Sequence, residues 1–536
     1  MFLKNAKCQM LKTKNIIVII SFAIYFIIGS YLSVTNGIPH DQWHEQHNWK
    51  VSLDAIKSFF NHSNGYQQLL DYKDKYHGIA FHYFSQPIQF LTYNLIAKIN
   101  HVSAENARYI SGHLAIFLIF SISGIYFYLL SLKISNNENF SLTSTAIFLL
   151  YPYLFGHAQI NEKDIPFLSL WLICTYYLFV VIENLYSDSK INIKNLIMIS
   201  FFTAFLISIR ITGILIILEY LVATIILINV RKINAFNFFQ KNIFLIFIFA
   251  TLLTLFVYIL SPIFWKNPLE FFNSITWMSK YYHDICTITL GECMRALNLP
   301  PSYYFIWFFF KLPILVLLGL LMYPLIEKKL FNNGIVTIYY GTLGLSLILI
   351  LLIFILKDVA LYDEIRHIMF LIPLIFLISF YNIFIFNKKI FYTLSILFLF
   401  FLILENIALK KYQYTWLNSF AKFTNIEKNF EVDYLGVSNK NIEKQIFNYS
   451  KINNISKDTC IYGGPYTGVY LEKLFFSCFK SYSELDAAKI RPFFVFQNVR
   501  NLRRSSPKDC KLIFDEFYKY NFSKQKVSVA KLWYCN

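Results

Sequence analysis

Long apolar runs, separated by polar connections, dominate the chain up to residue 408. A helix of about 20 apolar residues crosses a bilayer, and most of these runs approach or exceed that length. The pattern therefore predicts a mainly α, polytopic transmembrane helical bundle of about eleven spans. The runs lie at 16–34, 107–132, 140–156, 165–186, 194–209, 211–230, 243–262, 304–326, 334–356, 367–386 and 390–408.

Two of these runs, 194–209 and 211–230, are separated only by Arg210. One interpretation is a helical hairpin with Arg210 at its apex, and the other is a single long helix that breaks there. An arginine between apolar runs pairs with an anion, faces a polar cavity or extends its head group to the membrane surface.

The distribution of basic residues predicts the orientation of the bundle. Short basic connections at 231–242, 327–333 and 387–389 belong on the cytoplasmic side, and the lysines before the first run place the N-terminus there too. Alternation then puts every long polar loop on the opposite, outer side. The first outer loop, 36–106, includes an amphipathic stretch at 86–99 that suits the membrane surface.

The last part of the chain, 409–536, is polar in composition. Residues 440–452 have helical apolar spacing, whereas 491–499 and 526–534 have the pattern of strands. We therefore expect a transmembrane domain over 1–408 and a small C-terminal α/β domain over 409–536, on the outer side.

Composition narrows the class of protein further. Of the 536 residues, 56% are hydrophobic and only 15% are charged, whereas soluble domains carry about a quarter charged residues. The net charge of +18 does not indicate nucleic-acid binding, because many lysines lie in short loops and no soluble recognition element accompanies them.

Six cysteines fall on the predicted outer side, where an even number in an oxidising compartment fits disulfides. Cys286 and Cys293 are the simplest pair, and the other pairings stay open. A cysteine zinc site is not expected, because no CxxC spacing is present. The six are Cys286, Cys293, Cys460, Cys478, Cys510 and Cys535.

Candidate chemistry begins directly after the first run, in GIPHDQWHEQHNW (37–49). On a helix, Asp41 and Glu45 would share a face, and so would His40 and His44. Metal binding by these histidines is one interpretation, and a polar interfacial loop is the other. Asp41 suggests a function, because an acid at a membrane boundary is costly unless it is paired or faces a polar cavity.

A second polar stretch, FGHAQINEKDIPF (155–167), interrupts two apolar runs. A helix start explains Asp164 before Pro166, since Asp favours the N-cap and Pro the first turn. It does not explain why His157, Asn161 and Lys163 are present.

A third polar stretch, LKDVALYDEIRHIMFLIP (356–373), contains Asp363, Glu364, Arg366 and His367. Local ion pairs, for example of Asp363 or Glu364 with Arg366, are the simplest explanation. However, topology brings this loop, the two other stretches and Arg210 to one face of one bundle. Carboxylates suit a general base or a divalent metal, and arginine suits a phosphate. Together they indicate a substrate with a lipid tail and a phosphate head.

These stretches match a known family pattern over most of the chain. The matching segments are Asp41-Gln42, where the family often has two acids, GHAQINEKDIPF (156–167), YDEIRHIMF (362–370), YQYTWLN (412–418) and DYLG (433–436). The chain thus resembles the GT-C superfamily of membrane glycosyltransferases. It looks most like the bacterial branch of glycosyltransferase family 39, relatives of protein O-mannosyltransferases.

The resemblance implies transfer of a sugar, with inversion, from a polyprenyl-phosphate donor to a glycan, lipid or protein acceptor. It implies a bacterial inner-membrane protein whose active face and C-terminus are periplasmic. Asp41 would be the general base, and Asp164 a second catalytic residue. Substrate-binding roles would fall to His157, Asn161, Lys163, Arg210, Asp363, Arg366 and His367.

The resemblance also raises the question of a cofactor. A divalent cation, Mg²⁺ or Mn²⁺, would be held by Glu45 and Asp164, and no other cofactor is expected. Gln42 stands where the family often has a second acid, so that Glu45 or Glu162 takes its place or the site works with one carboxylate. The alternatives are a transporter or flippase of a lipid-linked or anionic substrate and an inactive GT-C-like scaffold.

Overall fold

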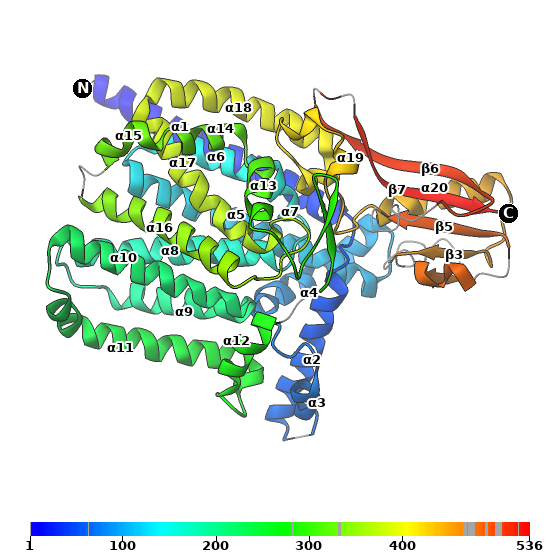
Figure 1. Ribbon diagram of the computed structural model, residues 1–536, viewed down its shortest axis with the longest axis horizontal. Helices are drawn as coiled ribbons and strands as arrows, with labels where there is room; N and C mark the ends of the chain where they lie inside the picture. The colour runs from blue at the N-terminus through cyan, green and yellow to red at the C-terminus, as the bar shows by residue number, and fades with distance from the viewer. Residues whose placement is uncertain are drawn as a thin grey trace.

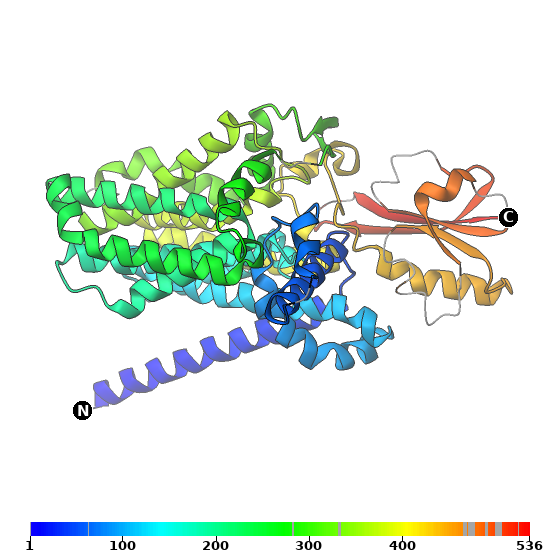
Figure 2. The same ribbon diagram turned by 90° about the horizontal axis from the view of Figure 1, so that it is seen from below.

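The computed structural model describes residues 2–62, 64–280, 283–330, 334–464, 469, 478–487, 491–498, 506–521, 523 and 525–536. A helical bundle forms one end of the molecule, and a small sheet domain with the C-terminus forms the other (Figure 1). The described N-terminal helix begins at the far end of the bundle (Figure 2). The predicted class, a mainly α membrane bundle with a small C-terminal α/β domain, is confirmed.

Eight helical segments in the described ranges are long and apolar enough to cross a membrane. Five of them are each a single helix: α1 (Phe2–Thr35), α5 (Ala104–Ser135), α8 (Asp164–Tyr186), α11 (Ala235–Leu260) and α16 (Gly334–Leu356). Three combine a helix with a 3-10 turn: η1 (Ile211–Leu215) with α10 (Ile216–Arg231), η3 (Arg366–Leu371) with α17 (Ile372–Phe386), and α18 (Lys388–Leu409) with η4 (Lys410–Thr415).

The other three predicted runs are helical but are not uninterrupted spans, which corrects the expected count. The run 194–209 forms α9 (Ile193–Ile209), a shorter apolar helix of 17 residues. The run 140–156 divides into α6 (Glu138–Leu150) and α7 (Pro152–His157), and 304–326 contains α13 (Ser302–Lys311) and α14 (Ile314–Leu321), bent by 118°. Both breaks precede a proline, because the residue before a proline favours extended backbone; Tyr151 and Leu312 have ψ of 114° and 138°.

The hairpin interpretation of Arg210 is confirmed. Arg210 is extended, with φ −144° and ψ 131°, and the chain reverses there. A Cβ on Gly213 would lie 2.9 Å from backbone atoms of Leu206 and Ile207, so η1 folds back onto the last turn of α9. A continuous broken helix would separate these residues by about 10 Å. The turn between α9 and η1 lies at the end of the bundle that faces the C-terminal domain (Figure 1).

Burial within the bundle is uneven and identifies its core. In the apolar part of the span containing η3 and α17, 94% of the residues are buried, and in that of α8 78% are buried. In the apolar part of α11 only 6% of the residues are buried. Apolar side chains of α11 such as Phe244 and Phe247 are therefore exposed to the lipid that a membrane supplies. The two central spans also carry Arg366 and Asp164 at their first residues, so the packed core fixes their positions.

The polar loops between the spans gather at the end of the bundle that meets the C-terminal domain (Figures 1 and 2). In the amphipathic α4, Phe90 and Leu91 are exposed, as expected for a helix on the membrane surface. The elements of these loops are α2 (Gln42–Phe60), α3 (Tyr66–Asp71), α4 (Ala80–Asn100), η2 (Pro262–Phe264), α12 (Glu270–Lys280), β1 (Cys286–Thr289) and β2 (Glu292–Arg295). The short α15 (Tyr323–Leu330) precedes α16.

The C-terminal domain is a five-stranded mixed sheet in the order β4-β3-β5-β7-β6, with a helix on one face. This helix is α20 (Asn439–Ile452), and its Ile442 and Ile446 pack against Phe494, Phe496 and Leu532 of the sheet. The helix and the two strands predicted here are present, and only residue 499 of the predicted strand lies outside the described residues. The elements are η5 (Ala421–Phe423), α19 (Ile426–Asn429), α20 (Asn439–Ile452), β3 (Cys460–Gly463), β4 (Phe479–Ser481), η7 (Tyr482–Ala487), β5 (Phe493–Asn498), β6 (Cys510–Lys519) and β7 (Lys526–Cys535).

All six outer cysteines form disulfides. The pairs are Cys286–Cys293, Cys460–Cys478 and Cys510–Cys535. The first pair is the one that the sequence suggests, and it closes the β1–β2 hairpin. Cys174 is a free thiol buried within α8.

Candidate active site

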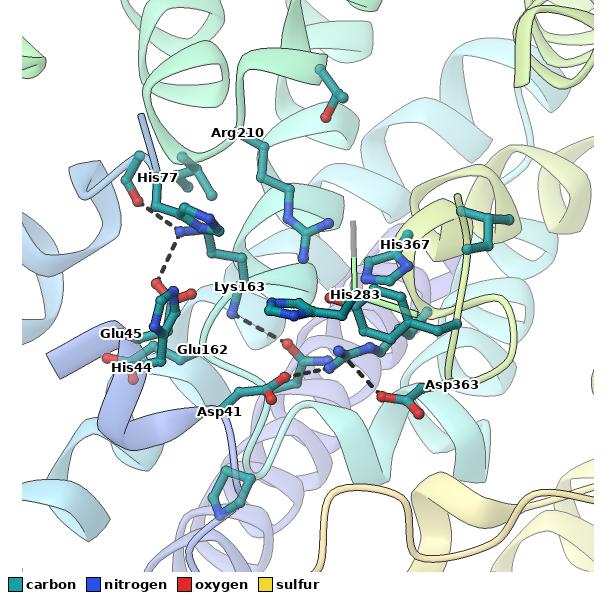
Figure 3. Close-up of a pocket in the computed structure, with 18 of the residues that line it drawn as sticks. Asp41, His44, Glu45, His77, Glu162, Lys163, Arg210, His283, Asp363 and His367 are labelled. Atoms are coloured by element: carbon teal, nitrogen blue, oxygen red, sulfur yellow. Dashed lines mark hydrogen bonds and ion pairs between the residues drawn. The ribbon is translucent and has the colours of Figure 1, made fainter. Parts of the chain in front are cut away.

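A cavity of about 420 Å³ lies where the polar loops meet (Figure 3). Segments far apart in the sequence form its walls: the start of α2, the α7–α8 loop, the turn at Arg210 and the loop before η3. Two of the predicted site residues, His157 and Asp164, are buried behind its wall. The eight others line it: Asp41, Glu45, Asn161, Lys163, Arg210, Asp363, Arg366 and His367.

Asp41 forms an ion pair with Arg366, and this pair joins the first outer loop to the start of a central span. Arg366 Nη1 lies 2.5 Å from Asp41 Oδ2, and its Nη2 lies 3.3 Å from Asp363 Oδ2. The Asp41 side chain is 54% exposed, whereas that of Arg366 is 6% exposed. A buried guanidinium thus holds an accessible carboxylate at the cavity.

The stretch GHAQINEKDIPF supplies a buried hydrogen-bonded row behind the cavity. Asp164 forms an ion pair with Arg210, and Asn161 Nδ2 donates to Asp164 Oδ2 over 2.9 Å. Asn161 Nδ2 also lies 3.0 Å from His157 Nδ1, and His157 Nε2 lies 2.8 Å from the hydroxyl of Tyr434. The row therefore connects Arg210 to the DYLG segment, more than 200 residues away along the chain.

The local role of this stretch differs from the prediction in one respect. Helix α8 begins at Asp164, but Asp164 does not supply the capping oxygen. Asn161 Oδ1 accepts hydrogen bonds from the backbone N–H groups of Asp164 and Lys163, at 2.8 and 3.2 Å. Asn161 thus fixes the loop while its amide group orients the Asp164 carboxylate.

Lys163 bridges three segments of the wall. Its Nζ lies 2.9 Å from Glu45 Oε2 and donates to the carbonyl of Gly78 over 2.8 Å. Burial alone would raise the pKa of Glu45, but the charge and hydrogen bond of Lys163 lower it to about 2. Glu45 is therefore a stable carboxylate that neutralises Lys163.

Gln42 has buried partners that its sequence position did not reveal. Its Nε2 donates to Glu162 Oε2 over 2.9 Å, and its Oε1 lies 3.0 Å from His113 Nε2. Gln46 donates to the other oxygen of Glu162. Burial, and then the negative charge of Glu45, raise the pKa of Glu162 to about 8. Gln42 therefore orients a neutral carboxyl group that lines the cavity.

Glu364 does not pair with Arg366, so that part of the local ion-pair interpretation is wrong. Its Oε2 lies 2.7 Å from Lys311 Nζ, and both side chains are 0% exposed. Tyr303 donates to the carbonyl of Glu364, and Lys311 donates to that of Trp416. Sequence reasoning missed Lys311, although a lysine inside an apolar run is a signal that it has a buried partner.

Glu45 and Asp164 do not fit the metal site suggested for them. Glu45 is occupied by Lys163, and the two oxygens of Asp164 are occupied by Arg210 and Asn161. A divalent cation would have to displace a charged partner from each carboxylate, which costs several kcal/mol for buried groups.

Many of the other residues that line the cavity are apolar. The cavity therefore combines charged groups with hydrocarbon, a combination that suits an amphiphile with an anionic head. The apolar lining residues include Ile209, Ile211, Met278, Ile285, Phe354, Val359 and Leu361.

Comparisons with known proteins give a distant similarity. No protein-family model matches the chain, and no curated protein is similar to it in sequence. A crystal structure of ArnT from Cupriavidus metallidurans bound to undecaprenyl phosphate is similar, with 9% identity and a TM-score of 0.42. ArnT in the apo state gives 10% identity and a TM-score of 0.45. Each comparison covers 96% of this chain and 97% of the other.

Proposed function

We propose that the chain is a GT-C-type membrane glycosyltransferase that moves a sugar from a polyprenyl-phosphate donor to an acceptor on the outer face of the bacterial inner membrane. The observation that carries this proposal is the accessible Asp41 carboxylate, held by Arg366 in a cavity that Arg210 and several apolar side chains also line. The resemblance of GHAQINEKDIPF and YDEIRHIMF to the bacterial family 39 branch supports it.

The proposed reaction is an inverting displacement. Asp41 takes the proton of an acceptor hydroxyl, whose oxygen attacks the anomeric carbon of the sugar. The bond from that carbon to the phosphate oxygen breaks, and polyprenyl phosphate leaves with the electron pair. Arg366 and Arg210 stabilise the charge that develops on the phosphate, since a guanidinium has five N–H donors and can share them between two anions.

The other polar residues have supporting roles in this proposal. Asp164 and His157, behind the wall, and Asn161, in its lining, orient Arg210, and Asp363 orients Arg366. Lys163 and His367 line the cavity and would contact the sugar or the phosphate. No step is assigned to a metal at Glu45 or Asp164, because their cation partners already occupy them.

The orientation in the membrane is part of the same proposal. The N-terminus and the short basic connections would be cytoplasmic, and the cavity and the C-terminal domain would face the periplasm. Three disulfides at the cavity end of the molecule favour this orientation, because disulfides persist in the periplasm and are reduced in the cytoplasm.

Transfer by the purified protein tests the proposal. We expect the chain, reconstituted with labelled polyprenyl-phosphate sugars and envelope acceptors, to release polyprenyl phosphate. Asp41→Asn should lower turnover about 100-fold or more, because a general base contributes at least that factor. Asp54→Asn is the matched control, since Asp54 lies in α2, whose N-cap residue is Asp41, and pairs only with exposed Lys57 among the ion pairs seen.

Arg366→Ala should lower kcat and raise the KM for the donor, since it removes a partner of the phosphate that also stabilises its developing charge. Full activity of Asp41→Asn would contradict the assignment of the base. Absence of turnover with every donor, together with lipid movement across vesicles, would favour a transporter or flippase. Absence of both activities would favour an inactive scaffold.

A further inference from the structure

A second polar cluster lies at the edge of the cavity, outside the charged network used above. His44 lies in the first turn of α2, and Asp74 and His77 lie in the turn before α4. One ligand atom from each of the three lies within 4.8 Å of the others. His44 Nδ1 is 4.0 Å from Asp74 Oδ2, and the rings of His44 and His77 meet edge-on with centroids 5.1 Å apart. Figure 3 shows both histidines on the same side of the cavity, beside Glu45.

The fold holds these residues in place before any ligand arrives. His77 N donates to the carbonyl of Asp74 over 2.9 Å, so the two side chains project from one tight turn. Lys163 Nζ donates to the next carbonyl, that of Gly78, and Tyr76 donates to Glu270 of α12. Each segment that carries a ligand is thus fixed by residues outside the cluster, as preorganised binding sites require.

We propose that His44, Asp74 and His77 form a site for a borderline transition-metal ion, of which Zn²⁺ is the best fit. Two imidazole nitrogens and one carboxylate oxygen suit Zn²⁺, whereas Mg²⁺ and Ca²⁺ prefer oxygen ligands only. All three side chains are partly exposed, so an ion can reach them. Three protein ligands leave a fourth position of a tetrahedral site open, on the side of the cavity.

Two further observations favour a ligand at this point. The Nε2 atom of His44 is buried and has no hydrogen-bond partner among the described residues, a state that costs free energy unless a ligand satisfies it. Ligand atoms of tetrahedral zinc are about 3.4 Å apart. The three ligand atoms here, which lie within 4.8 Å of one another, would therefore have to approach by less than roughly 1.5 Å to complete the site.

This site differs from the histidine pair that the sequence suggests. His40 precedes α2 and does not share a helical face with His44. Its Nε2 lies 3.0 Å from Asn498 Nδ2 of β5, so its ring is directed to the C-terminal domain. The partners of His44 come instead from a turn 30 residues further along the chain.

Metal binding to the full-length protein tests this inference directly and requires no sugar transfer. The protein, purified in detergent without a histidine tag and treated with chelator, is titrated with Zn²⁺ alone and analysed by calorimetry and elemental analysis. We expect one Zn²⁺ per chain at micromolar or lower Kd. His44→Ala and His77→Ala should each weaken binding at least 10-fold. Co²⁺ in the same site should give the visible absorption of a tetrahedral ion.

His47→Ala is the matched control, because His47 lies in the same helix but stacks on Trp43 outside the cluster. It should bind Zn²⁺ normally. His44→Cys should retain Zn²⁺ binding, since cysteine is also a zinc ligand. Retained binding would show that the loss of binding in His44→Ala is not caused by misfolding. Stoichiometry near zero after reloading would overturn the site, as would equal loss of binding in His47→Ala. Both results leave the glycosyltransferase proposal intact, because Asp41 and Arg366 are not ligands.

Discussion

Gln42 occupies the position at which the chain departs from the two acids common in the family it resembles. Its amide lies between His113 and Glu162, both of them buried, and it donates to the carboxyl oxygen of Glu162. The departure therefore replaces a second acid by a hydrogen-bond donor that suits a neighbouring carboxyl group. Glu162 brings a carboxyl group to the same part of the cavity lining.

Restoring the acid at position 42 should be harmful. Gln42→Glu removes the amide donor and places a second acidic group against Glu162, where ionisation of either group is disfavoured by the other, and we expect a loss of about 1–3 kcal/mol in the free energy of unfolding. Thermal unfolding in detergent measures this loss. The double variant Gln42→Glu with Glu162→Gln exchanges the two groups and should recover most of it. Equal instability of the double variant would show that the contact with Glu162 is not the cause.

Glu162 should also make stability depend on pH. Its folded-state pKa of about 8 lies above the ordinary value of 4.5, so the folded protein retains a proton that the unfolded chain releases. The resulting stability is present in full below pH 4.5 and is lost as pH rises through 8, at up to about 1.4 kcal/mol per pH unit. Glu162→Gln, which is neutral throughout, should remove this part of the slope in unfolding measured from pH 5 to 8. An unchanged slope would assign it to another group.

Sequence reasoning named most of the polar residues that line the cavity but few of their partners. Asp41, Arg210 and Arg366 were recognisable from the sequence because a charged side chain at a membrane boundary is costly unless it is paired or faces a polar cavity. The partners of Glu364 and Gln42 could not be predicted from the sequence. These contacts depend on how loops that are tens to hundreds of residues apart pack together. The same limit applies to His44, whose neighbours in space lie in a different turn.

At the scale of elements, the contact between α7 and η4 links the candidate site to the end of the last span. A Cβ at Gly156 would lie 2.1 Å from the backbone nitrogen of Tyr414, so only glycine allows this approach. His157 follows Gly156 directly and begins the hydrogen-bonded row toward Arg210. The packing of two backbones thus sets the position of polar residues in the site.

Gly156→Ala should separate these two elements. We expect a loss of about 1–3 kcal/mol in stability from the enforced backbone shift, together with reduced sugar transfer. Gly344→Ala is the matched control, because a Cβ at that position of α16 meets nothing within 4 Å. It should be neutral or slightly stabilising in the same unfolding measurement. Similar losses in both variants would contradict the role of the contact.

The apolar runs predicted every spanning helix because lipid demands a continuous apolar segment with internally satisfied backbone. The breaks before Pro152 and Pro313 were not predicted, since spanning helices tolerate proline when neighbours satisfy the freed backbone groups. In this chain Tyr151 and Leu312 instead adopt extended conformations, which ends each helix.

At the scale of the whole molecule, the disulfides and the termini define its two ends. The three pairs lie in the β1–β2 hairpin and the C-terminal domain, and α1 begins at the opposite end of the bundle (Figure 1). Such a distribution is expected of a chain whose cavity end folds in an oxidising compartment.

Thiol labelling checks this arrangement. In the unfolded, unreduced protein, only two of the eight cysteines should be alkylated, Cys8 and Cys174, because the other six are paired. All eight should react after reduction, and mass spectrometry of the peptides should recover the three pairs. Labelling of further cysteines in protein made in a cell with intact disulfide-forming machinery would contradict the pairing or the proposed orientation.

The ion pair between Asp41 and Arg366 has a consequence for the order in which substrates bind. If Asp41 is the base, as proposed above, an acceptor that arrives first meets a carboxylate already paired with the guanidinium of Arg366. In the proposed reaction, a donor phosphate that takes up Arg366 releases Asp41 for the acceptor. Binding is then ordered, with the donor first, and polyprenyl phosphate inhibits by competing with the donor. Acceptors can accumulate at the membrane without starting a cycle, and the supply of lipid-linked sugar determines when transfer begins.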